Sequence, residues 1–137
     1  MMRWLRSFWR GSGSIRILAV MPRTPDSHTL SQIAAKERWR VEFAKNPAAA
    51  LRLMERERFP VILCDRDVDG ASDWRASLDS LASAAPRACL ILTAPSNNDT
   101  LWQEVISHGG FDVLTKPFQE QRVIRAIYSA LEARGRS

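Results

Sequence analysis

The sequence predicts an α/β fold with a doubly wound parallel sheet of five strands, and three observations support this prediction. Short apolar runs alternate with amphipathic segments from Ser14 to the end of the chain. Three of the apolar runs contain almost no polar residue, which is typical of strands whose two faces are both covered by helices. Right-handed crossovers between parallel strands would then place helices on both sides of the sheet.

The expected strands are short and rich in apolar or β-branched side chains. The second of them alternates polar and apolar residues with a period of two, so we expect it to be partly exposed. The strands are expected at Ile15–Val20, Arg38–Ala44, Val61–Cys64, Ala88–Thr93 and Phe111–Thr115.

A helix is expected after each strand, and local patterns mark several of the helix ends. Asp26 or Ser27 caps the first helix, which runs to about Lys36. Asn46–Pro47 supplies an N-cap and a first turn for the second helix, which Phe59–Pro60 ends. The remaining helices are expected at 72–83, at 96–110 with its closing glycines, and within 116–135 after an initial turn.

The chain has 137 residues, which suits one domain with a single core. We assign residues 15–137 to that domain and residues 1–14 to an N-terminal tail and linker. No apolar run approaches the roughly 20 residues needed to span a bilayer, and the N-terminus lacks the pattern of a signal peptide. Cys64 and Cys89 have no CxxC neighbour, so neither a zinc site nor a disulfide framework is expected. These features predict a cytoplasmic protein.

The net charge is +5 and the sequence pI is about 10.0, a balance that also occurs in nucleic-acid-binding proteins. Acidic residues interleave with the basic ones, however, so we expect a solvated surface and no direct nucleic-acid binding. In the tail, a helix would place arginines opposite large apolar residues. We therefore expect residues 1–10 to dock on a membrane surface or in a partner's groove. The arginines are Arg3, Arg6 and Arg10, and the apolar residues are Trp4, Leu5, Phe8 and Trp9.

Three polar residues follow or end three of the expected strands: Asp65, Thr93 and Lys116. In a doubly wound sheet the functional crevice lies at this carboxyl edge. A carboxylate there can attack an activated phosphoryl group and form an acyl phosphate. A hydroxyl and an ammonium can stabilise the phosphoryl oxygens, and the small Ala94 leaves room for them. The three residues therefore predict a phosphoacceptor site at Asp65.

If Asp65 and Thr93 mark the same sheet edge, the two cysteines lie at different heights on neighbouring strands. Cys64 is one residue below that edge and Cys89 is four below it. Three residues along a strand correspond to about 10 Å, which is beyond the reach of a disulfide. We therefore expect two free thiols.

The segments PVILCDRDVDG and GGFDVLTKPF, with the pair Thr93 and Ala94, resemble the receiver domain of bacterial two-component response regulators. The resemblance covers about residues 15 to 134 and implies the sheet order 2-1-3-4-5. It implies that Asp65 takes phosphate from a histidine kinase, a phosphotransfer protein or a small phosphodonor. Thr93 would be the switch hydroxyl and Lys116 the phosphate-binding lysine. A stand-alone receiver of this kind would signal to a downstream protein partner and would be no enzyme beyond its own phosphorylation and dephosphorylation.

Two positions depart from the family pattern. The pair of acids that holds Mg²⁺ after the first strand is replaced by Met21 and Pro22, which offer no side-chain oxygen. Asp65 and Asp67 remain as ligands of a weak Mg²⁺ site, and Asp26 is a further acid that would have to reach back from the next helix. We therefore expect Mg²⁺ binding to be weak or absent.

The second departure is Val113, which occupies the place of an aromatic rotamer switch three residues before the lysine. Because valine cannot swing in that way, the alternative interpretation is a degenerate pseudo-receiver that binds partners without phosphorylation. A flavodoxin-like enzyme is less favoured, since the connection MPRTPDSH contains no glycine to cradle a phosphate. No Ser–His–Asp arrangement is apparent either.

Overall fold

A parallel sheet forms the centre of the computed structural model, which describes residues 14–68 and 73–135. Its strands are β1 (Arg16–Val20), β2 (Arg40–Ala44), β3 (Val61–Asp65), β4 (Cys89–Ala94) and β5 (Asp112–Thr115). The strand order across the sheet is β2-β1-β3-β4-β5, and each adjacent pair is parallel. The prediction of a doubly wound sheet in the order 2-1-3-4-5 is therefore confirmed.

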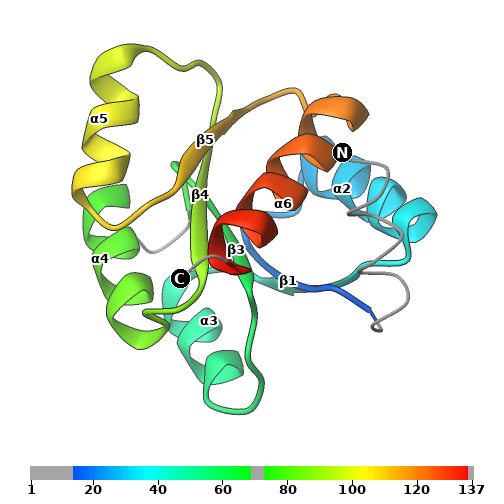
Figure 1. Cartoon of the computed structure of the whole chain (residues 1–137), viewed down its shortest axis with the longest axis horizontal. Coiled ribbons are helices and arrows are strands. Elements are labelled where there is room, and N and C mark those ends of the chain that lie inside the picture. Colours follow the sequence, from blue (N-terminus) through cyan, green and yellow to red (C-terminus); the bar gives the residue numbers. More distant parts are fainter. Residues whose placement is uncertain (1–13, 69–72, 136–137) are drawn as a thin grey trace.

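Five helices cover the two faces of the sheet in the described part of the chain. They are α2 (Pro25–Glu37), α3 (Pro47–Met54), α4 (Trp74–Ala84), α5 (Asp99–Ser107) and α6 (Glu120–Gly135). Figure 1 shows α2 and α6 on one side of the sheet and α3, α4 and α5 on the other. This division follows from right-handed crossovers on a sheet whose strand order reverses after β1.

Two apolar cores result, because successive residues of a strand point to opposite faces. Ile17 and Ala19 of β1 pack in the core that lies under α2 and α6. Leu18 and Val20 pack in the core that lies under α3, α4 and α5. The central strands are thus buried on both sides, which explains why the sequence shows them as continuous apolar runs. In α6 three residues spaced four positions apart are buried, namely Val123, Ile127 and Leu131.

The beginning of α2 corrects one expectation, because the N-cap is Thr24 rather than Asp26 or Ser27. Pro25 occupies the first turn, where its missing N–H costs nothing and its fixed φ suits a helix. Ser27 instead lies three residues after the cap and supports it from inside the helix. Its Oγ accepts a 3.0 Å hydrogen bond from the Thr24 amide and donates a 2.9 Å bond to the Thr24 carbonyl.

Other helix ends agree with the sequence or shift by a few residues. Asn46 caps α3 through a 2.8 Å hydrogen bond from the Ala49 amide, as predicted. The helix ends at Met54, earlier than the expected boundary at Phe59–Pro60, and Phe59 is buried in the core instead. After α5, Gly109 adopts a φ of 86°, a left-handed conformation that favours glycine at a helix C-terminus.

Candidate functional site

Asp65 and Thr93 lie side by side at the carboxyl edge of the sheet. Asp65 is the last residue of β3 and is paired in register with Thr93 of β4. Only 3% of Asp65 is exposed, and Thr93 is fully buried. A buried carboxylate requires hydrogen-bonding partners to offset the loss of water, and both side chains have such partners.

Two donors converge on one oxygen of the Asp65 carboxylate. The Thr93 hydroxyl donates a 2.7 Å hydrogen bond to Oδ1. Nζ of Lys116 lies 2.7 Å from the same Oδ1. The other oxygen, Oδ2, accepts a 3.2 Å hydrogen bond from the backbone amide of Asp67. The structure thus brings together Asp65, Thr93 and Lys116 as the sequence predicted, around a single carboxylate.

The backbone holds these side chains in place. The amide of Arg66 donates a 2.9 Å hydrogen bond to the Thr93 carbonyl, which fixes the turn after β3 against β4. The amide of Lys116 donates a 2.9 Å bond to the Ala94 carbonyl. Phe118 is buried two residues beyond Lys116, in the core under α2 and α6. Lys116 is therefore anchored on both sides, while 19% of its side chain remains exposed.

Apolar residues, Met21 and Pro22, follow β1 at the two positions where the receiver pattern has a pair of acids. Met21 is 5% exposed and packs in the core under α2 and α6. Its amide donates a 3.0 Å hydrogen bond to the Ala44 carbonyl of β2, so the backbone here continues the sheet. A thioether offers Mg²⁺ no hard oxygen ligand. Met21 therefore serves the core, and the side chain cannot serve as a Mg²⁺ ligand.

The remaining acids do not rebuild a full metal site. Within residues 14–68 and 73–135, no three histidine, cysteine or acidic side chains are grouped closely enough to hold a metal ion. Asp26 therefore does not join Asp65 and Asp67 in a ligand set. Asp67 is largely exposed and its carboxylate pairs with Arg66 at 3.2 Å. The donor set of two carboxylates, one already bound by Thr93 and Lys116, does not fit the oxygen-rich site that Mg²⁺ requires.

Val113 lies beneath the same edge and is almost fully buried. It packs in the core under α3, α4 and α5 together with Leu92 and Val105. A small branched side chain in a packed core has a restricted χ1 angle. Val113 thus has neither the ring nor the rotamer freedom that a swinging aromatic would need.

The two cysteines lie at the different heights that the sequence predicts. Cys64 is paired in register with Leu92, whereas Cys89 is paired with Val61, three residues away along the strand pair. Both thiols are free. Burial, assisted by the charge of Asp65, raises the pKa of Cys64 from its ordinary value of 9.0 to about 12. Cys64 is therefore a protonated core residue beside the site.

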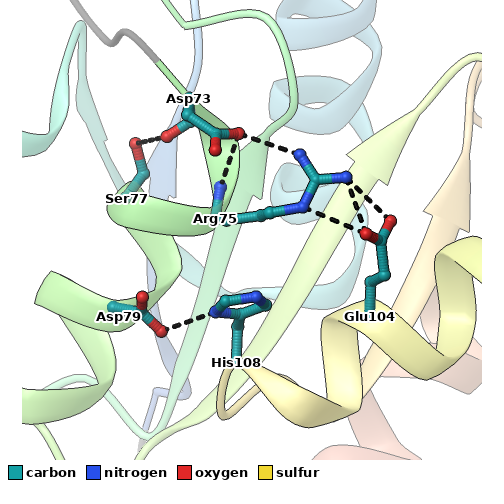
Figure 2. A network of polar contacts seen from close by, with 6 residues as sticks. All are labelled: Asp73, Arg75, Ser77, Asp79, Glu104 and His108. Atoms are coloured by element: carbon teal, nitrogen blue, oxygen red, sulfur yellow. Dashed lines mark hydrogen bonds and ion pairs between the residues drawn. The ribbon is translucent and has the colours of Figure 1, made fainter.

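A second polar network joins α4 to α5 and was not predicted from the sequence (Figure 2). Arg75 donates to both carboxylate oxygens of Glu104, with Nη2 at 2.7 Å from Oε1 and 2.9 Å from Oε2. Its guanidinium also lies 4.5 Å from the ring centre of Trp74. Nearby, Nδ1 of His108 lies 2.8 Å from Oδ1 of Asp79. These contacts depend on how two helices pack, and only the interleaved charges hinted at them.

The family model of the response regulator receiver domain matches residues 26–128. The chain belongs to this family. The strand order 2-1-3-4-5 of the sheet agrees with this membership. No curated protein matches the chain.

Solved structures of other receivers share the fold. A CheY-like receiver domain protein from Methanospirillum hungatei has a TM-score of 0.80 and 20% identity, covering 90% of this chain and 98% of that one. The chemotaxis protein CheY4 of Vibrio cholerae has a TM-score of 0.78 and 18% identity, covering 86% and 99%. NtrX from Brucella abortus has a TM-score of 0.80 and 22% identity, covering 89% of this chain and 28% of that longer one.

The protein is therefore a receiver of two-component signalling. Receivers are in general signalling modules rather than enzymes, and they interact with histidine kinases or phosphotransfer proteins. Among the described residues, no helix is both long and apolar enough to cross a membrane. Residues 1–13 lie outside the described residues, and the predicted docking of residues 1–10 stays a prediction.

Proposed function

We propose that Asp65 is the phosphoacceptor of this receiver and that Thr93 and Lys116 bind the transferred phosphoryl group. One observation carries the proposal: a hydroxyl and an ammonium converge on Oδ1 of the Asp65 carboxylate. This carboxylate lies at the edge of the sheet and is only 3% exposed. Both donors match the needs of a phosphoryl group that gains negative charge near them.

The reaction transfers one phosphoryl group without redox change. A carboxylate oxygen of Asp65 attacks the phosphorus of a phosphohistidine or a small acyl phosphate, and a new O–P bond forms. The bond between phosphorus and the donor's nitrogen or oxygen breaks, and the leaving group departs with the electron pair. Thr93 and Lys116 then exchange their bonds to Oδ1 for bonds to the phosphoryl oxygens.

The output of the receiver is proposed to pass through protein contacts. A histidine kinase or a phosphotransfer protein supplies the phosphoryl group, and a downstream protein reads the altered edge of the sheet. Because Val113 replaces the aromatic switch, the movement of Thr93 itself is the proposed first step of the read-out. Residues 1–10 are proposed to add a docking contact to a membrane surface or a partner groove.

A pseudo-receiver that works without phosphorylation is the second candidate, and one observation favours it. The missing acidic pair removes the oxygen ligands that would hold Mg²⁺ beside Asp65, and buried Met21 takes their place. Without the metal, the phosphoryl group would lose its largest counter-charge and transfer would be slow.

Intact-mass measurement after incubation with acetyl phosphate, with and without Mg²⁺, separates the two candidates. We expect one added phosphoryl mass, which Asp65→Asn abolishes. Asp112→Asn is the matched control, because Asp112 lies at the opposite end of β5 from Lys116 and accepts a 2.8 Å hydrogen bond from the Val113 amide. Labelling that persists in Asp65→Asn would refute the assignment of the acceptor. Absence of labelling by acetyl phosphate and by kinase would establish the pseudo-receiver.

A further inference from the structure

A pocket of about 960 Å³ opens between α2 and the connection from β2 to α3. Met21 and Ala44 contribute to its lining, and the hydrogen bond between their backbones joins β1 to β2 there. Pockets of roughly 300–1,000 Å³ are typical of small-molecule sites. The hollow therefore has the size to hold a small ligand at the carboxyl edge of the sheet.

Basic side chains line this pocket without any acidic one. Arg23, His28 and Lys45 belong to the lining, and among the residues that the structure describes no aspartate or glutamate does. Some other surface cations have carboxylate partners, such as Lys36 with Glu120 at 3.0 Å. Within the described part of the chain, Arg23 and Lys45 form no ion pair of this kind. Unpaired cations around one hollow repel each other and attract an anion.

The lining also offers hydroxyls and an aromatic wall. Thr24 and Ser31 supply hydroxyl groups beside the cations. Phe43 lines the pocket as well, and 41% of it is exposed, as is the case for only two other large apolar side chains among the described residues. An exposed aromatic ring can stack against a planar ring of a ligand. The pocket thus combines an anion-binding half with an apolar half.

We propose that this pocket binds a nucleotide, with its phosphate held by Arg23 and Lys45 and its base against Phe43. Arginine and lysine donate charge-assisted hydrogen bonds to phosphate oxygens, and nucleotides join a phosphate to a planar ring in one small molecule. Neither charge nor ring alone accounts for the lining, whereas this ligand class uses both.

The nucleotide site is separate from the proposed phosphoacceptor. Val20 is paired with Ala44 on one side and with Cys64 on the other. The end of β1 therefore stands between the pocket, on the β2 side, and Asp65, on the β3 side. Binding of a nucleotide does not depend on whether Asp65 accepts phosphate, so the two proposals can fail independently.

Amide chemical-shift titrations of the full chain with AMP, adenosine and inorganic phosphate test the proposal. We expect AMP to shift the amides around Arg23 and Lys45, adenosine to shift them far less, and inorganic phosphate to bind more weakly than AMP. Arg23→Ala with Lys45→Ala should weaken AMP binding about tenfold, since each exposed charge contact is worth up to about 1 kcal/mol. Asp65→Asn should leave it unchanged.

Arg52→Ala with Arg56→Ala is the matched control, because both arginines are exposed and lie outside the pocket lining. If this control weakens AMP binding as much as Arg23→Ala with Lys45→Ala, the attraction is a general effect of net charge and the proposal is wrong. Equal affinity for AMP and inorganic phosphate would overturn the role of Phe43. Shifts centred on Asp65 and Lys116, or no shifts at millimolar AMP, would overturn the site.

Discussion

The Thr93 hydroxyl donates a 2.7 Å hydrogen bond to Oδ1 of Asp65, its register partner on the neighbouring strand. A hydroxyl has one proton to donate, so it serves one acceptor at a time. A phosphoryl group on Asp65 would therefore compete with the carboxylate for this donor. The position of Thr93 is in this way tied directly to the chemical state of Asp65.

Thr93→Val removes this hydroxyl with little change of shape. We expect the free energy of unfolding to fall by about 1–2 kcal/mol, because the buried Asp65 carboxylate loses one donor and keeps Lys116. Urea unfolding measures the change. Thr115→Val is the control, since Thr115 ends the neighbouring strand and is only partly buried. An equal loss in both variants would mean that the Thr93 bond contributes nothing specific.

Magnesium binding should be weak, because two carboxylates provide little compensation for removing water from Mg²⁺. We expect amide shifts near Asp65 that do not saturate at sub-millimolar Mg²⁺. Asp65→Asn should remove those shifts. Saturation below millimolar concentration, centred on Asp65, would show that other oxygens complete the site.

The thiol of Cys64 should make the protein less stable in alkali. Burial raises its pKa to about 12 in the folded state, from an ordinary value of 9.0. The folded chain therefore retains a proton that the unfolded chain releases. This contribution to stability is complete below about pH 9 and is lost as the pH rises toward 12.

Chemical unfolding at several alkaline pH values tests this effect. We expect the free energy of unfolding to fall less steeply between pH 9 and 11 in Cys64→Ala than in the parent protein, although the variant is less stable at pH 7. Cys89→Ala is the control, because Cys89 is only partly buried. Identical slopes in the parent and Cys64→Ala would contradict the buried, protonated thiol.

Truncation before Gly11 should leave the melting midpoint nearly unchanged, because the helices and strands of the described residues already cover both faces of the sheet. The same truncation should weaken binding to anionic vesicles or to a native partner, since the arginines and tryptophans are removed. Vesicle co-sedimentation of both forms measures this loss. A markedly lower midpoint would mean that residues 1–10 pack on the domain instead of docking elsewhere.

The sequence was sufficient to place Asp65, Thr93 and Lys116 together, because parallel strands bring their carboxyl ends to one edge. It also predicted the offset between Cys64 and Cys89, since this offset follows from counting along paired strands. Such features depend on strand direction and register, which apolar runs specify well.

Two kinds of feature were harder to predict: which of several suitable residues caps a helix, and which side chains meet when separate elements pack together. Thr24 caps α2 because Pro25 must occupy the first turn, although Asp26 and Ser27 are equally good capping residues. The contact between Arg75 and Glu104 joins residues 29 positions apart, and it requires the crossing geometry of two helices. The basic pocket likewise depends on two stretches of the chain, 21–31 and 43–49, meeting in space.

The Arg75–Glu104 contact joins α4 to α5, the two helices that precede and follow β4 in the chain. Two bonds from a planar guanidinium to one carboxylate resist rotation as well as separation. Such a contact couples a rotation of α4 to a rotation of α5. A shift of α4 is therefore expected to be passed to α5, although the two helices lie on opposite sides of β4 in the sequence.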